Sequence, residues 1–87
     1  MKNSMNLEGK NLLVQTVTNF YTGEVVEETS KHLKLSKAAW IADTGRFSQA
    51  LEKSVFDEVE PFPKAVYVMK SAIVAMTEID TLPRDQK

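Results

Sequence analysis

The sequence contains no cysteine and only one histidine, His32. The absence of cysteine excludes disulfides, thiolate zinc sites and thiol nucleophiles, and it is typical of a reducing compartment. One histidine without cysteine supplies neither a zinc site nor a serine–histidine pair. Glycine-rich phosphate-binding motifs are also absent. The acidic clusters at 27–28 and 57–60 are explained as solvated charges. We therefore predict a binding protein with no cofactor and no metal, and not an enzyme.

Long hydrophobic runs and an excess of positive charge are missing as well. No apolar run reaches the roughly 18 residues that a membrane-spanning helix needs, and the N-terminus lacks the apolar core of a signal peptide. The formal net charge is −1, whereas binding to the phosphate backbone of duplex nucleic acid requires a basic surface. These features predict a cytoplasmic protein that binds neither membranes nor duplex nucleic acid.

With 87 residues, the chain predicts a single domain that buries only roughly 60–65% of its unfolded surface, so self-association would help it. We expect a flexible leader over residues 1–10, one β-rich domain over 11–80 and a tail over 81–87. Alternating and β-branched residues predict strands, and a capped apolar stripe predicts one helix over 45–54. The predicted strands cover 12–18, 23–28, 32–36, 38–42, 65–70 and 73–79.

These elements predict a mainly β protein with one short helix (α+β). We expect a small antiparallel curled sheet, or an SH3/Sm-like barrel, of five to six strands with the helix inserted after the fourth. Residues 20–23 are predicted to reverse the chain, and the strands 23–28 and 32–36 to form a hairpin. The strands 65–70 and 73–79 are predicted to form a second hairpin around Lys70-Ser71-Ala72. Val59 is expected at a sheet edge.

The predicted helix start carries the strongest candidate for a binding site. Asp43 or Thr44 is a suitable N-cap, Gly45 allows close approach, and Arg46 adds a planar cation, which together suit a phosphate. The alternative is that Asp43 caps the helix, Arg46 pairs with an acidic residue, and Phe47 belongs to the core.

Aromatic residues lie close to this stretch in the sequence. Trp40 precedes the helix, and Phe20 and Tyr21 follow the first strand. Such rings stack on nucleobases with about 1–3 kcal/mol each, although Trp40 could equally be a core residue.

The chain resembles a family of small tailed-phage proteins, the viral nucleotide sponges. The resemblance covers nearly all of the chain from Leu12. It is carried by Thr16-Val17-Thr18, Tyr21-Thr22-Gly23, Ala38-Ala39-Trp40-Ile41-Ala42-Asp43-Thr44-Gly45-Arg46-Phe47, Glu58-Val59-Glu60-Pro61-Phe62-Pro63, Ala72-Ile73-Val74, Leu82-Pro83 and Gln86-Lys87.

This resemblance implies a phage protein of immune evasion in the cytoplasm of the infected bacterium. Sponges sequester cyclic oligonucleotide or cyclic ADP-ribose signals of CBASS and Thoeris defence as homo-oligomers, without cleaving them. The closer resemblance is to anti-CBASS sponges that hold cyclic dinucleotides such as 3',3'-cyclic GMP-AMP. We expect a tetramer or hexamer that binds this second messenger between protomers, because so small a chain has no room for an internal cavity of that size.

In this hypothesis Arg46 and Gly45 contact phosphate, Tyr21, Trp40 or Phe47 stacks on a base, and the Thr18 and Thr44 hydroxyls make polar contacts. Two other classes stay open. One is an Sm-like RNA-binding ring that uses residues 70–72. The other is a protein that inhibits a host enzyme by direct contact, with Phe62 and Trp40 as anchors.

Overall fold

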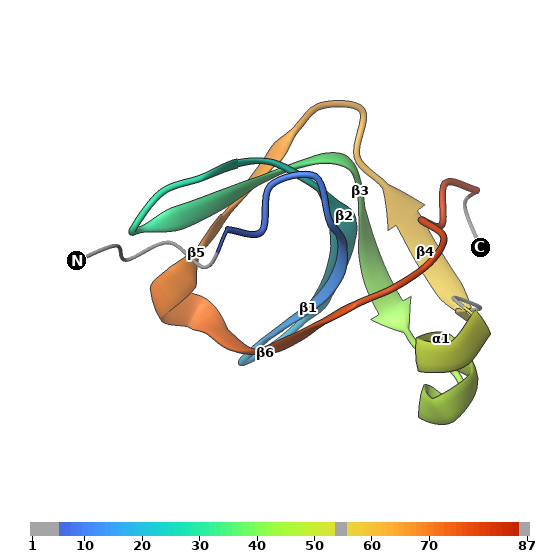
Figure 1. Ribbon diagram of the computed structural model, residues 1–87. Helices are drawn as coiled ribbons and strands as arrows, with labels where there is room; N and C mark the ends of the chain where they lie inside the picture. Colours follow the sequence, from blue (N-terminus) through green and yellow to red (C-terminus); the bar gives the residue numbers. More distant parts are fainter. Residues whose placement is uncertain (1–5, 54–55, 86–87) are drawn as a thin grey trace.

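A computed structural model describes residues 6–53 and 56–85 of the chain. It is mostly β-structure with one short helix, as predicted, and its six strands form an antiparallel sheet that is curled but not closed (Figure 1). The strands follow the order β4-β3-β2-β1-β6, and β5 pairs with the first half of β3. The elements are β1 (Asn11–Thr16), β2 (Phe20–Glu28), β3 (His32–Asp43), α1 (Phe47–Lys53), β4 (Glu58–Pro61), β5 (Val66–Met69), the 3-10 helix η1 (Lys70–Ala72) and β6 (Ile73–Glu78).

The longest strand, β3, joins two segments that the sequence predicts as separate strands. Lys37 lies between them with a positive φ of 51°. The pairing with β2 shifts in register near this point, between Thr22 and Glu24. A bulge of this kind changes which face the following side chains occupy, so that Leu35 and Ala38 both reach the same core. The prediction of two strands was therefore wrong, and α1 follows the third strand, not the fourth.

Two predicted turns also differ from the structure. Phe20 and Tyr21 begin β2 and pair with β3, so the chain reverses earlier, over residues 17–19. β5 pairs with β3 while β6 pairs with β1, and no ladder joins β5 to β6 within the described residues. The predicted second hairpin is therefore wrong, because η1 carries the chain from one side of the curled sheet to the other. Val59 does join the sheet, in β4.

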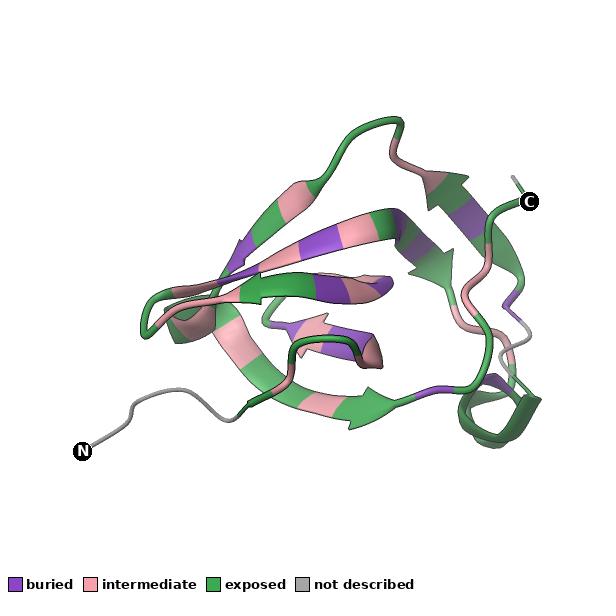
Figure 2. Ribbon diagram, turned by 45° about the horizontal axis from the view of Figure 1, so that its top comes forward, coloured by how far each residue is buried: buried purple, intermediate pink, exposed green. Residues whose placement is uncertain are grey.

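The core consists of two clusters of buried side chains on opposite faces of the sheet. Buried residues alternate with more exposed ones along the strands (Figure 2). The first cluster fills the concave side and includes Leu12, Val14, Val25, Leu33, Leu35, Ala38 and Val68. The second includes Leu13, Ala39, Ile41, Ala50, Phe56, Val59 and Ile79. Consecutive residues of β1 enter different clusters because strand side chains alternate between faces. The strand is therefore apolar on both faces.

A buried ion pair ties η1 to the end of β2. Lys70 Nζ lies 2.7 Å from Glu28 Oε2, and only 1% of the Glu28 side chain is exposed. The other carboxylate oxygen accepts the Leu7 N–H at 2.7 Å, and the Lys70 N–H donates to the Lys31 carbonyl at 2.8 Å. These contacts position the turn from which β6 starts.

Thr22 offers a test of the packing between the sheet and the second cluster. Its side chain is fully buried, and its hydroxyl has no hydrogen-bond partner among the described residues. A buried hydroxyl without a partner costs about 1–3 kcal/mol. We expect Thr22→Val, which keeps the shape, to raise the free energy of unfolding by about 1 kcal/mol in urea denaturation. A variant less stable than wild type would mean that the hydroxyl forms a bond that matters.

Candidate functional site

An aromatic pair lies on the concave face of the sheet, beyond the first cluster. Tyr21 in β2 and Trp40 in β3 are direct cross-strand partners, so their side chains share one face. Trp40 belongs to neither buried cluster and is 39% exposed. The Tyr21 ring lies 6.3 Å from the Phe62 ring, and its hydroxyl accepts a hydrogen bond from Asn19 Nδ2 at 3.2 Å. Neighbouring side chains thus hold the Tyr21 ring in place, while Trp40 remains open for a ligand to stack on it.

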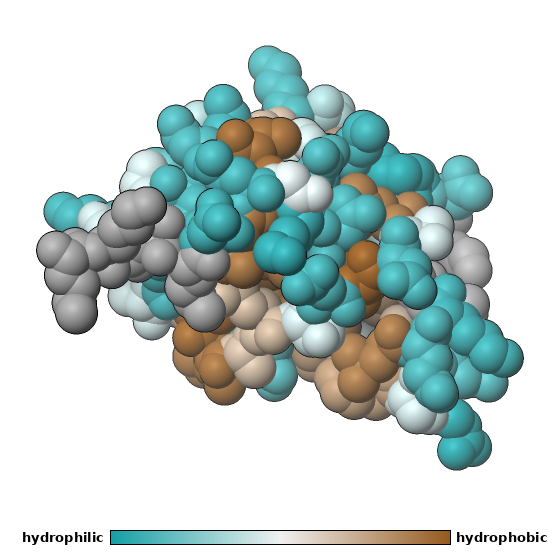
Figure 3. All heavy atoms as spheres, viewed as in Figure 1, coloured by the Kyte–Doolittle hydropathy of each residue, from teal (hydrophilic) through white to brown (hydrophobic). Residues whose placement is uncertain are grey.

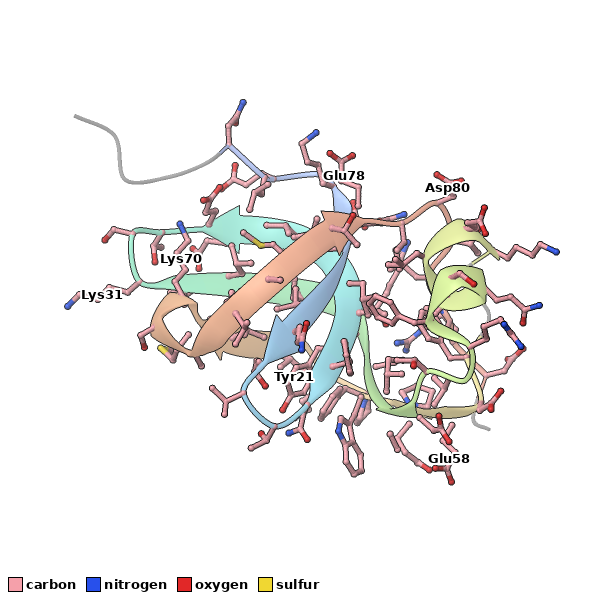
Figure 4. All side chains as sticks on the ribbon, turned by 90° about the horizontal axis from the view of Figure 1, so that it is seen from below. Tyr21, Lys31, Glu58, Lys70, Glu78 and Asp80 are labelled. Carbon is pink, nitrogen blue, oxygen red and sulfur yellow. The ribbon has the colours of Figure 1, made fainter. Side chains whose placement is uncertain are left out.

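A cleft of about 270 Å³ opens beside Tyr21, and we call it the Tyr21 cleft. Its lining includes Thr16, Thr18, Tyr21, Tyr67, Met69 and Ala72. Tyr21 projects at the end of the sheet where β1 turns into β2 (Figure 4). The fold therefore brings Thr18 and Tyr21 together, as the binding hypothesis requires.

Residues 44–46 form a tight loop between β3 and α1. Gly45 has a positive φ of 67°, a left-handed conformation that ends β3 and that glycine adopts without strain. Its N–H donates to Asp43 Oδ1 at 2.8 Å, and the Thr44 hydroxyl donates to the Gly45 carbonyl at 3.1 Å. The helix begins only at Phe47, two residues later than predicted. The predicted last residue, Ser54, lies outside the described residues.

A second carboxylate packs against this loop. A Cβ on Gly45 would lie 2.7 Å from Asp57 Oδ1, and the Asp57 N–H donates to the Asp43 carbonyl at 3.0 Å. The Gly45 amide is therefore already bonded, with a carboxylate on either side. The cationic Arg46 side chain is exposed, and it forms no ion pair with any residue that the structure describes. Of this loop, Arg46 is the residue best able to reach a phosphate.

Phe47 lies on the face of the sheet opposite to Tyr21. Its ring is 5.9 Å from that of Phe20, the neighbour of Tyr21 along β2, and neighbouring strand residues point to opposite faces. Phe47 is 47% exposed and lines a second cleft of about 260 Å³, here called the Phe47 cleft. Leu13, Gln15, Leu51, Ala75 and Thr77 also line it. Hydrophobic side chains gather on this part of the surface, beside α1 (Figure 3).

The predicted site residues thus lie in three places within one chain. Thr18, Tyr21 and Trp40 lie at the concave face, and Phe47 lies on the convex face, with residues 44–46 in the loop between β3 and α1. The sequence did not reveal that Tyr67 and Met69 line the Tyr21 cleft, nor that Asp57 packs on Gly45. Tyr67 and Met69 flank the buried Val68 in β5, an alternation that places both on the exposed side of the strand.

Few of the described residues could bind a metal ion or act in catalysis. Across the described ranges 6–53 and 56–85, no group of three or more acidic or histidine side chains could hold a metal ion. His32 Nε2 lies 3.0 Å from Glu27 Oε1, and its ring packs edge-on against Tyr67 at 5.2 Å. Among the helices that the structure describes, none has the length and hydrophobicity to cross a membrane.

The chain matches no protein-family model, no curated protein and no solved structure.

Proposed function

We propose that this protein binds and sequesters a cyclic oligonucleotide immune signal without cleaving it, as a phage protein of immune evasion in the cytoplasm of the infected bacterium. The favoured ligand is a 3',3'-cyclic GMP-AMP-like dinucleotide, held between protomers of a homo-oligomer. The observation that carries the proposal is that aromatic and cationic residues singled out by the sequence remain outside the core. Trp40, Phe47 and Arg46 are all exposed.

The size of the two clefts supports a site that is shared between chains. Each has a volume of about 260–270 Å³, below the roughly 300–1,000 Å³ of typical ligand pockets. Competition with a host receptor requires about nanomolar affinity, or −12 kcal/mol. At roughly 0.3 kcal/mol per atom, a ligand of about 45 heavy atoms reaches this only when most of it is enclosed. A second protomer supplies the missing walls.

The position of the predicted residues leads to the same arrangement. Tyr21 and Phe47 lie on opposite faces of the sheet, so one ligand molecule cannot stack on both within a single chain. In an oligomer, Arg46 of one protomer can approach the aromatic pair of another. A two-fold axis would then offer each phosphate one copy of Arg46.

Calorimetry with a panel of cyclic dinucleotides and trinucleotides and cyclic ADP-ribose tests this proposal. We expect at least one member to bind with about nanomolar affinity, and the nucleotide released by heat to be chemically intact. Failure of every member to bind more tightly than micromolar would overturn the proposal. Recovery of a linear product would show cleavage.

Arg46→Ala is expected to weaken binding of that ligand by about 1.5–3 kcal/mol, or roughly 10- to 150-fold, because a hydrogen bond to a charged group is lost. The matched control is Lys53→Ala, which removes an exposed cation at the other end of α1. The control should bind as wild type does. If Arg46→Ala stays folded and binds equally well, the phosphate lies elsewhere.

Each of the two alternative functions relies on one residue that is engaged in other contacts in the structure. Lys70, one of the residues 70–72 expected to contact RNA in an Sm-like ring, is paired with Glu28, and only 18% of its side chain is exposed. Phe62, expected to anchor a host enzyme, packs against the first buried cluster and against Tyr21.

A further inference from the structure

β6 is an edge strand that pairs regularly with β1 over residues 75–78, and its register shifts at Val74. The Ile79 N–H donates to the Asn11 carbonyl at 3.0 Å, and the pairing continues in register to Leu13 and Thr77. Backbone groups in an antiparallel pair point alternately toward and away from the partner strand. Met76 and Glu78 therefore direct their N–H and C=O groups away from β1. In the described part of the chain, no strand pairs with this outer edge.

At the other end of the strand order, β4 is protected against pairing with another strand, whereas β6 is not. β4 is short and carries Glu58, Glu60 and Pro61, and charges and proline are the usual devices that prevent edge-to-edge pairing. The first five residues of β6, 73–77, contain neither charge nor proline. Val74 is 62% exposed. This edge is suited to accept another strand.

We infer that β6 pairs antiparallel with β6 of a second copy of this chain, about a two-fold axis near Met76. The inference rests on the proposed function for the expectation that copies of this chain associate. A second copy fits this edge because its strand has the same length and the same apolar composition. Pairing Met76 with its own copy, or with Glu78 of that copy, keeps the two Glu78 carboxylates from facing each other, a like-charge contact that would be destabilising.

This pairing also completes the Phe47 cleft. Ala75 and Thr77 of β6 form part of its lining, and strand residues of the same parity lie on one face of a continuous sheet. A second β6 therefore extends the floor of the cleft beyond its present edge. The clefts of the two protomers then open on one sheet face, where Phe47 and Leu51, both exposed in the single chain, border them.

Substitution at Glu78 (Figure 4) tests the interface in the full-length protein without ligand. Glu78→Pro removes an N–H that points away from β1, whereas Glu78→Ala removes only the carboxylate and serves as the matched control. Light scattering coupled to size exclusion should give an even number of protomers for wild type and for Glu78→Ala. Glu78→Pro should raise the dissociation constant of this contact by about tenfold or more, since each substitution acts twice across the axis. A monomeric wild type, or a folded Glu78→Pro protein with unchanged association, overturns the inference.

Hydrogen exchange on the wild-type protein gives a readout that does not depend on a folded variant. The Met76 and Glu78 amides should be protected when the protein is associated and should lose protection on dilution, while the Thr77 amide stays protected by β1 throughout. Fast exchange at Met76 and Glu78 in the associated protein would show that the copies meet through another surface. Neither experiment uses a nucleotide, so paired β6 strands in a protein that binds no cyclic nucleotide would disprove the proposed function and leave this interface standing.

Discussion

Lys70→Met is expected to lower the free energy of unfolding by about 3 kcal/mol, measured by urea denaturation at neutral pH. Breaking a buried ion pair by removing one partner typically costs about 3–5 kcal/mol, because the remaining charge has already lost its hydration. The Glu28 side chain is 1% exposed and that of Lys70 18% exposed, so this pair is close to that limit. For a domain whose total stability is about 5–10 kcal/mol, this is a large fraction.

Two controls separate burial from charge. Lys10→Met breaks a solvent-exposed pair with Glu78 at 3.4 Å and should change the stability by no more than about 0.5 kcal/mol. The double variant Glu28→Gln with Lys70→Met should regain part of the loss, because a buried amide costs less than a buried carboxylate. It also keeps an acceptor for the Leu7 N–H. Equal losses from Lys70→Met and Lys10→Met would contradict the importance of burial.

Phe56→Ala is expected to lower the free energy of unfolding by about 3–5 kcal/mol, the usual cost of emptying a phenylalanine site in a core. Phe56 is 2% exposed and packs in the second cluster between α1 and β4. Without this ring, the chain that enters β4 loses its contact with the second cluster. Thermal unfolding followed by circular dichroism measures the effect.

Phe47→Ala is the matched comparison, since it deletes the same side chain nine residues earlier from a half-exposed position. We expect a loss of about 1 kcal/mol, in proportion to its partial burial. A loss at Phe47 equal to that at Phe56 would place Phe47 in the core, which is the alternative that its sequence position left open. A small loss leaves the ring available for a ligand or a second protomer.

The sequence predicts the class of fold because local signals dominate it. Alternation of Leu33 and Leu35, and the apolar residues of β1 and β6, identify strands without knowledge of their partners. The division of β3 was mispredicted because the bulge is at a lysine, Lys37, with a positive φ. Lysine carries no signal for this conformation, whereas glycine or asparagine would have indicated it.

Gly23 misled the prediction for a different physical reason. Glycine commonly marks a turn, but Gly23 lies within β2, where an added Cβ would be 2.7 Å from the Leu35 Cβ. It is needed for close packing, and only the three-dimensional contact reveals this. The pairing of β5 and β6 with different strands was likewise invisible, because neighbouring strands in sequence usually form hairpins.

The candidate site was predictable in part for the same reasons. Tyr21, Trp40 and Phe47 could be chosen from residue type alone, but the separation of Phe47 from the other two depends on which residues of β2 and β3 pair. The contact of Asp57 with Gly45 arises from a backbone hydrogen bond across the α1 connection. No local pattern in residues 56–60 indicates this contact.

The pairing of β1 with β6 also bears on how the chain folds. β1 lies between β2 and β6, and its ladder with β6 joins residues separated by more than half of the chain. Such distant contacts slow folding, since the entropy of closing the long loop is lost before the contacts form. During synthesis, β1 and β2 can pair early while one side of β1 waits for the last strand. The nascent protein therefore acquires its complete sheet only after residue 79 has left the ribosome, and until then β1 is itself an unprotected apolar edge.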